Sequence, residues 1–113
     1  MKSILIVDDN LEILQLLSSI LKQHFQTYEA TGVGEAVKWL KSITVDAICC
    51  DYNMRDGTGV ELLKRLRKQG IKTPFMLMSA SDERYLANEV QSLGGSFCCK
   101  TDCTFTEKIK TLV

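Results

Sequence analysis

Acidic side chains stand directly after two apolar runs of this 113-residue sequence. Asp8 and Asp9 follow the run Ile4–Val7, and a third carboxylate, Asp51, follows Ala47–Cys50. Short apolar runs of this kind are typical of buried strands in a parallel sheet. Ligands bind beyond the carboxyl ends of such strands, so we expect the three carboxylates to meet at one edge. Mg²⁺ prefers carboxylate and water oxygens, which makes this edge a candidate magnesium site.

Two further apolar runs end in other polar groups. Phe75–Met78 leads into Ser79, and Phe97–Cys99 leads into Lys100. A carboxylate can attack phosphorus to form an aspartyl phosphate. That chemistry needs groups that neutralise the phosphoryl oxygens, and a cation, the Lys100 ammonium and the Ser79 hydroxyl supply them. Taken singly, Ser79 is an ordinary polar residue before a helix and Lys100 a solvated charge; their places at successive strand ends favour a functional role.

The acidic pair also has a structural interpretation. Asp8 or Asp9 could cap the following helix, and Asn10 could do so equally well. Two adjacent carboxylates with a third at another strand end are harder to explain this way, because clustered like charges are unfavourable without a cation. Metal binding is therefore the preferred interpretation.

Charge and hydropathy narrow the class of protein. The 14 basic and 14 acidic residues cancel, and the isoelectric point is about 6.6. This balance argues against broad binding to nucleic acid or anionic membranes. The first apolar run stops at two aspartates, unlike a signal peptide, and no run approaches the roughly 20 apolar residues of a membrane span. We expect a single cytoplasmic domain over residues 1–113.

Strand-like runs alternate with helical stripes along the chain. Strands are expected near residues 4–7, 25–30, 45–50, 74–78 and 96–99, and five βα units of this kind imply a parallel sheet with helices on both sides. The first helix has an apolar stripe at helical spacing, formed by Ile13, Leu16, Leu17 and Ile20 and broadened by Leu21. A loop is expected from Asn53 to Gly57, followed by a capping box of Thr58 and Glu61. Ser81 or Asp82 would cap the helix after the fourth strand.

The five cysteines are expected to be small buried hydrophobic residues of a reducing compartment. A zinc site is the sharper alternative, but adjacent cysteines on a strand, such as Cys49 and Cys50, point to opposite faces. A regulatory disulfide involving Cys103 stays open.

Taken in order, these residues resemble a response-regulator receiver domain of two-component signalling, similar to the chemotaxis regulators. The resemblance rests on the run Ile4–Asp9, on Asp51 with Gly59 eight residues later, on Ser79-Ala80 and on Lys100. It implies a flavodoxin-like (βα)5 doubly wound sheet of five parallel strands in the order 2-1-3-4-5.

The resemblance also assigns roles to these residues. Asp51 would accept a phosphoryl group from a histidine kinase or phosphorelay protein. Asp9 and Asp51 would bind Mg²⁺ directly, Asp8 through water and Asn53 through its backbone carbonyl. Ser79 and Lys100 would contact the phosphate, and Ser79 with the aromatic Phe97 would form the switch. The domain would be a signalling phosphoacceptor rather than an enzyme, assisting only its own phosphorylation and dephosphorylation.

The implied partners are a kinase and a downstream protein. By resemblance, a kinase would dock beside Leu11, Leu14 and Gln15 of the first helix. The downstream protein would bind the face of the fourth helix, fifth strand and fifth helix. No direct contact with nucleic acid or membrane is expected, and a homodimer formed on phosphorylation stays open.

Two positions depart from the family pattern. Arg55 and Thr101 stand where the family usually has prolines, the second with a cis peptide bond. A non-proline cis bond costs about 2.5–4 kcal/mol, so the Lys100-Thr101 bond is either strained or trans with a shifted lysine.

Three alternatives remain to be compared. A haloacid-dehalogenase-type phosphatase would need a second aspartate where Asn53 stands, and a nucleotide- or flavin-binding domain would need phosphate-binding glycines after the first strand. The third alternative is a pseudo-receiver, an interaction module that works without phosphorylation, and the complete acidic set argues against it.

Overall fold

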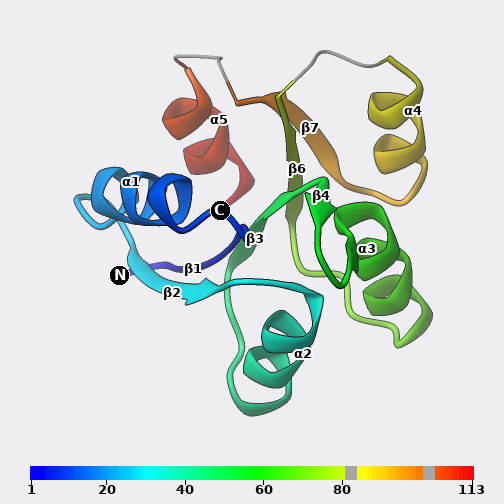
Figure 1. Ribbon diagram of the computed structural model, residues 1–113, viewed down its shortest axis with the longest axis horizontal. Helices are drawn as coiled ribbons and strands as arrows, with labels where there is room; N and C mark the ends of the chain where they lie inside the picture. Colours follow the sequence, from blue (N-terminus) through cyan, green and yellow to red (C-terminus); the bar gives the residue numbers. More distant parts are fainter. Residues whose placement is uncertain (81–83, 101–103) are drawn as a thin grey trace.

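The structure, a computed structural model, describes residues 1–80, 84–100 and 104–113. Five parallel strands form its main sheet in the order β2-β1-β3-β6-β7 (Figure 1). They span, in chain order, β1 Ser3–Val7, β2 Gln26–Ala30, β3 Ala47–Asp51, β6 Phe75–Ser79 and β7 Ser96–Cys99. Read as the first to fifth long strands, this is the predicted 2-1-3-4-5 order, and the flavodoxin-like prediction is confirmed.

Helices cover both faces of this sheet. One face carries α1 (Leu11–Leu21) and α5 (Phe105–Leu112), and the other carries α2 (Val33–Ser42), α3 (Gly59–Lys68) and α4 (Arg84–Ser92) (Figure 1). Neighbouring strand residues point to opposite faces, so Cys49 packs towards α1 and α5 whereas Cys50 packs towards α2 and α3. None of the described helices is long and apolar enough to cross a bilayer.

Of the four cysteines that the structure describes, Cys49, Cys50 and Cys98 are buried as predicted, whereas Cys99 is half-buried. The adjacent Cys49 and Cys50 belong to cores on opposite faces, which prevents them from sharing one metal ion. Cys103, named above for a disulfide, lies outside the described residues.

The predicted apolar stripe of α1 is only partly right. Leu14, Leu17 and Leu21 are buried against the sheet, whereas Leu16 is 59% exposed. Because most residues of this helix are apolar, several stripes fit its sequence, and packing selects one of them. Asn10 caps the helix by accepting hydrogen bonds from the backbone N–H groups of Glu12 and Ile13.

The segment after β3 differs from the predicted loop. Residues 53–58 form a two-stranded antiparallel ribbon of β4 (Asn53–Met54) and β5 (Gly57–Thr58). Thr58 then caps α3 as predicted, accepting a hydrogen bond from the backbone N–H of Glu61. Ser81 and Asp82, proposed as caps of α4, lie outside the described residues.

Candidate functional site

Three carboxylates meet where β1 and β3 end side by side. Asp8 and Asp9 follow β1, and Asp51 is the last residue of β3. One oxygen from each lies within 4.8 Å of the other two. Within the described residues, this is the one group of His, Cys, Asp and Glu side chains gathered closely enough to hold a metal ion. The predicted convergence of the three carboxylates is confirmed.

The Lys100 side chain enters this acidic cluster from the end of β7. Its Nζ lies 2.7 Å from Asp8 Oδ2 and 3.0 Å from Asp51 Oδ1. The Asp8 side chain is fully buried, and that of Lys100 is 17% exposed. The ammonium therefore compensates two carboxylates that are largely removed from water, which an exposed surface lysine could not do.

The ionisation of this group reflects burial and pairing together. Burial alone would lower the pKa of Lys100, but its hydrogen bonds to Asp8 and Asp51 outweigh that effect, and the pKa is raised. Burial raises the pKa of Asp51, and the hydrogen bond from Lys100 offsets part of the increase. Asp51 is thus a poorly solvated carboxylate, and nearby cations such as Lys100 stabilise its charged form.

The other predicted residues lie around the same edge. Ser79 is buried at the end of β6, between the strands that lead to Asp51 and Lys100, and its backbone carbonyl accepts a hydrogen bond from the Lys100 N–H. Asn53 is exposed in β4, two residues after Asp51. Phe97 is half-buried in β7 and packs against the core under α2, α3 and α4. Thr101 lies outside the described residues, and so does its peptide bond with Lys100.

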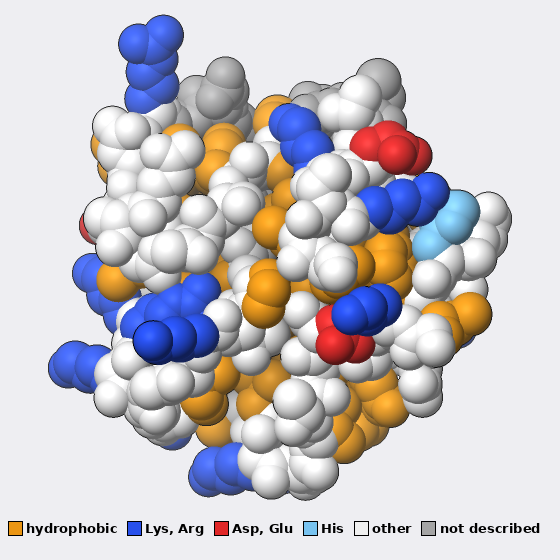
Figure 2. All heavy atoms as spheres, turned by 180° about the vertical axis from the view of Figure 1, so that it is seen from behind, with side chains coloured by type: hydrophobic (Ala, Val, Ile, Leu, Met, Phe, Trp, Pro, Cys, Tyr) orange, Lys and Arg blue, Asp and Glu red, His pale blue; other side chains and the backbone are white. Residues whose placement is uncertain are grey.

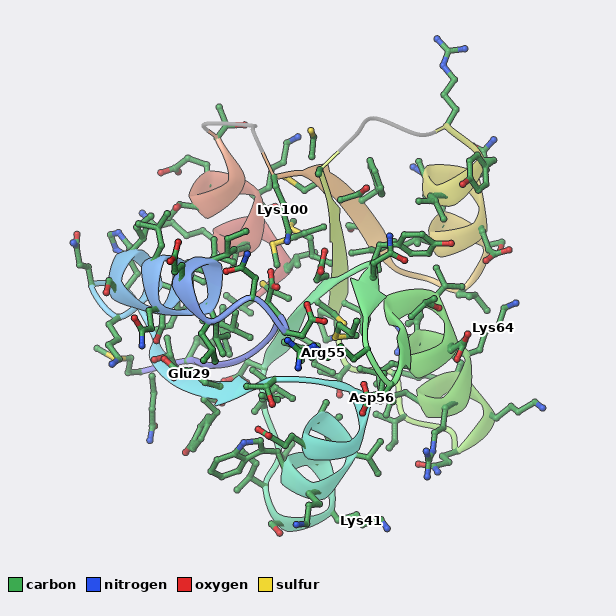
Figure 3. All side chains as sticks on the ribbon, viewed as in Figure 1. Glu29, Lys41, Arg55, Asp56, Lys64 and Lys100 are labelled. Atoms are coloured by element: carbon green, nitrogen blue, oxygen red, sulfur yellow. The ribbon has the colours of Figure 1, made fainter. Side chains whose placement is uncertain are left out.

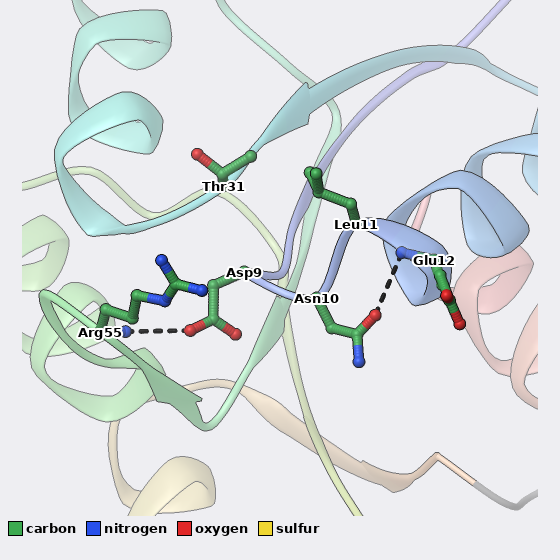
Figure 4. Close-up of a pocket in the computed structure, with 6 residues that line it drawn as sticks. All are labelled: Asp9, Asn10, Leu11, Glu12, Thr31 and Arg55. Carbon is green, nitrogen blue, oxygen red and sulfur yellow. Dashed lines mark hydrogen bonds between the residues drawn. The ribbon is translucent and has the colours of Figure 1, made fainter.

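An open cavity of about 810 Å³ adjoins the acidic cluster (Figure 4). Asp9, Asn10, Leu11, Glu12, Thr31 and Arg55 line it. The backbone N–H of Arg55 donates to Asp9 Oδ2 at 3.1 Å, and the exposed Arg55 side chain extends beside Asp9 (Figure 4). The sequence placed a cation near the acidic site, but it gave no sign of this backbone contact.

One residue of the predicted kinase-docking surface is wrong. Leu14 is only 3% exposed because it packs under α1 against the sheet. Leu11 is 59% exposed and Gln15 is also exposed. Leu11 and Gln15 can meet a partner, whereas Leu14 can only support the helix from below.

A second depression lies beside α3, on the side of the molecule where Lys and Arg side chains gather in Figure 2. Lys64, Arg65 and Lys68 line it and are exposed. Arg67 also lines it, but its guanidinium donates to the backbone carbonyls of Leu93, Ile71 and Thr73. That arginine joins α3 to the loops before β6 and after α4, and the depression is lined by one carboxylate, Glu61, rather than by a cluster of them.

The donor set at the acidic edge fits a hard divalent cation. Its ligand atoms are carboxylate oxygens, with the Asn53 backbone on the adjacent ribbon. Mg²⁺ commonly uses one or two carboxylates and keeps several waters, and the open cavity beside Asp9 leaves room for them. No thiol or imidazole belongs to the group, so a zinc site of the cysteine type does not fit here.

Comparisons with known proteins converge on one family. The response regulator receiver domain matches residues 4–101. The chain is 34% identical over 86 residues to the Regulator of RpoS from Escherichia coli K12, covering 72% of this chain and 24% of that protein. The Francisella response regulator 1452 receiver domain has a TM-score of 0.93 and 27% identity, covering 99% of this chain and 96% of its own. Response regulator TrrA of Thermotoga maritima, solved with Mg²⁺ and beryllofluoride, has a TM-score of 0.88 and 26% identity, with both chains fully covered.

The curated relatives are longer proteins. This chain spans about a quarter to a third of the length of those named here. Several are transcriptional regulators, from Bacillus subtilis and Caulobacter vibrioides among others. The expectation of no contact with nucleic acid therefore finds no support in these relatives.

Proposed function

Because this chain belongs to the response regulator receiver domain family, we propose that it is an active receiver, phosphorylated on Asp51 in a Mg²⁺-dependent reaction. Receiver domains are signalling domains of two-component systems rather than classical enzymes. They take part in phosphoryl transfer and bind Mg²⁺ at an acidic site. The proposal concerns whether this chain keeps that activity or is a pseudo-receiver.

The contact that carries the proposal is the one between Lys100 and the acidic edge. The Lys100 ammonium lies 3.0 Å from Asp51 and 2.7 Å from Asp8. This position supports a phosphoacceptor role for Asp51, because the ammonium can pair with a phosphoryl oxygen when Asp51 becomes a phosphoaspartate. A pseudo-receiver would have no need to keep three carboxylates within 4.8 Å of one another, two of them paired with a lysine, at a cost in desolvation.

In this proposal the residues of the acidic edge bind the cation in different ways. Asp9 and Asp51 bind it directly, Asp8 binds through water, and Asn53 contributes its backbone carbonyl. When bound, Mg²⁺ supplies positive charge to phosphoryl oxygens beside Asp51. The fit rests on the carboxylate oxygens within 4.8 Å of one another and on the open cavity beside Asp9.

Asp51 acts as the nucleophile. Its carboxylate oxygen forms a bond to the phosphorus of a phosphohistidine or acyl phosphate, and the bond between phosphorus and the donor breaks. Lys100 then exchanges its bond to Asp51 Oδ1 for one to a phosphoryl oxygen, and the Ser79 hydroxyl contacts another. Attack of water on phosphorus later returns Asp51 to a free carboxylate and releases phosphate.

The output in this proposal is a change of surface. Ser79 moves towards the phosphoryl group, and Phe97, half-buried in β7, turns inward and repacks the face of α4, β7 and α5. A downstream protein, or a second phosphorylated copy of this chain, binds to that face. A histidine kinase or phosphotransfer protein docks beside Leu11 and Gln15, which are exposed near the acidic edge. Residues 1–113 act as one receiver unit in the cytoplasm.

Intact-mass measurement after incubation with acetyl phosphate tests this function. With Mg²⁺ the protein is expected to gain one phosphoryl group, and without Mg²⁺, or in Asp51→Asn, it is expected to gain none. If no adduct forms and beryllofluoride also fails to bind, the chain is a pseudo-receiver. Arg55 and Thr101 are then the first residues to replace with the proline that the family usually has at these positions.

A further inference from the structure

The tip of the β4–β5 ribbon is held on two opposite sides. On one side the backbone N–H of Arg55 donates to Asp9 Oδ2 at 3.1 Å. On the other side the carboxylate of Asp56 accepts hydrogen bonds from the backbone N–H groups of Val33 and Gly34, both at 2.9 Å and each to a different oxygen. Figure 3 shows Asp56 between the ribbon and the start of α2. The adjacent residues Arg55 and Asp56 thus connect Asp9, in the acidic cluster, to the start of α2.

Asp56 serves as the cap that α2 does not have in its own sequence. The N-cap position of α2 is Gly32, which has no side chain to accept the first helical N–H groups. Asp56 supplies the missing acceptor from 22 and 23 residues away, and its negative charge suits the positive end of the helix. The hydrogen bonds from Gly34 and Val33 lower the pKa of Asp56, as expected for a carboxylate held in its charged form.

Gly32 is matched to this contact. A Cβ at position 32 would lie 2.6 Å from Asp56 Oδ1, so that carboxylate would have to move to make room for any side chain. The backbone of Gly32 is extended, with φ at −178°, so its conformation would accept other residues. The constraint on position 32 therefore comes from its contact with the Asp56 carboxylate. At Gly34 the equivalent distance to Asp56 Oδ2 is 3.4 Å, an ordinary contact.

We infer that Asp56 is a positioning residue for the cation site, acting through the ribbon tip and the Arg55 N–H on the orientation of Asp9. The inference rests on the proposed function, in which Asp9 is a cation ligand. Because Oδ2 of Asp9 accepts a hydrogen bond from the Arg55 N–H, Oδ1 would be the Asp9 oxygen left to bind the cation. Linkage makes the coupling reciprocal: cation binding at Asp9 stabilises the start of α2.

The test is to measure the Mg²⁺ affinity of the protein and its variants by titration calorimetry. Asp56→Ala is expected to weaken Mg²⁺ binding by about 3- to 10-fold, less than the 10- to 100-fold typical when a group bonded directly to a metal ligand is removed. Gly32→Ala is expected to do the same, because the new methyl group displaces the Asp56 carboxylate. Asp56→Asn keeps one acceptor oxygen, so its Mg²⁺ affinity is expected to lie between those of the unchanged protein and Asp56→Ala.

Two controls separate positioning from general weakening of α2. Glu35→Ala removes the hydrogen bonds that Glu35 accepts from Thr31 at the same end of the helix, and Gly34→Ala places a methyl group at ordinary contact distance from Asp56. Both are expected to bind Mg²⁺ like the unchanged protein. With acetyl phosphate, Asp56→Ala is expected to need more Mg²⁺ for half-maximal rate and to reach the unchanged rate at saturation.

The outcomes are distinguishable. If Asp56→Ala binds Mg²⁺ like the unchanged protein, or if Glu35→Ala weakens binding equally, Asp56 has no positioning role, whereas the proposed function stands. If the unchanged protein itself fails to bind Mg²⁺ and to accept a phosphoryl group, the proposed function fails and takes this inference with it.

Discussion

Replacing Lys100 with methionine removes the counter-charge of the acidic cluster while keeping most of the side-chain volume. The ammonium lies 2.7 Å from the fully buried Asp8 and 3.0 Å from Asp51. Removing one partner of a buried ion pair costs about 3–5 kcal/mol, because an uncompensated charge is left behind. Some of the Lys100 side chain reaches solvent, so we expect a loss of about 3 kcal/mol in the free energy of unfolding at pH 7 without Mg²⁺.

Protonation sets a ceiling on this cost. The variant can escape the unpaired charge by protonating an aspartate, which for an ordinary pKa near 3.9 costs about 4 kcal/mol at pH 7 and about 1.5 kcal/mol at pH 5. Burial already raises the pKa of Asp51, so the cost at pH 7 lies below that ceiling. The destabilisation should therefore shrink as pH falls. Lys100 itself, with a pKa raised above 10.5, keeps its stabilising charge at both pH values and loses it only in strong alkali.

Urea unfolding at pH 7 and pH 5, with and without Mg²⁺, measures these effects. Lys110→Met is the matched control, because the ion pair of Lys110 with Glu107, at 3.6 Å, is exposed and its loss should cost less than about 0.5 kcal/mol. Saturating Mg²⁺ should restore most of the stability lost in Lys100→Met. A loss below about 1 kcal/mol at pH 7, or one that changes with neither pH nor Mg²⁺, would refute the view that Lys100 compensates buried carboxylates.

Three further changes test other parts of the account. Asp51→Asn should raise the melting temperature at pH 7 without Mg²⁺: the raised pKa of Asp51 means that its charged form costs stability, and the gain should vanish as acid protonates Asp51 in the unchanged protein. Gly59→Ala should lower stability by about 2–3 kcal/mol in thermal unfolding, because the new Cβ would lie 2.5 Å from the Asp51 carbonyl oxygen; unaltered stability would contradict the packing described. Cys49, whose pKa burial raises to about 12, should resist iodoacetamide in the native protein at pH 8 and react in urea, as read by peptide mass mapping; native labelling would contradict its burial.

The fold and the acidic cluster could be predicted because both depend on strand ends. Apolar runs fix the strands, and the carboxyl ends of parallel strands meet at one edge, so Asp8, Asp9 and Asp51 had to converge. Lys100 was predicted at this edge too, although not its contact with two carboxylates at once.

Other features depend on packing that a single sequence does not reveal. In α1 most positions are apolar, so the choice of Leu14 over Leu16 for the core is made by the sheet beneath it. Asp56 caps a helix that begins 23 residues earlier in the chain, and such a pairing leaves no local spacing to read. Gly32 gave no signal of this either, because glycine is itself a common N-cap residue.

Locating the phosphoryl group tests the central claim most directly. After reaction with acetyl phosphate and Mg²⁺, borohydride reduction converts an aspartyl phosphate to homoserine, and fragment masses identify the residue. Homoserine is expected at position 51 alone, and none is expected when Mg²⁺ is withheld. Homoserine at another aspartate, or an unreduced chain throughout, would contradict the assignment of Asp51 as the phosphoacceptor.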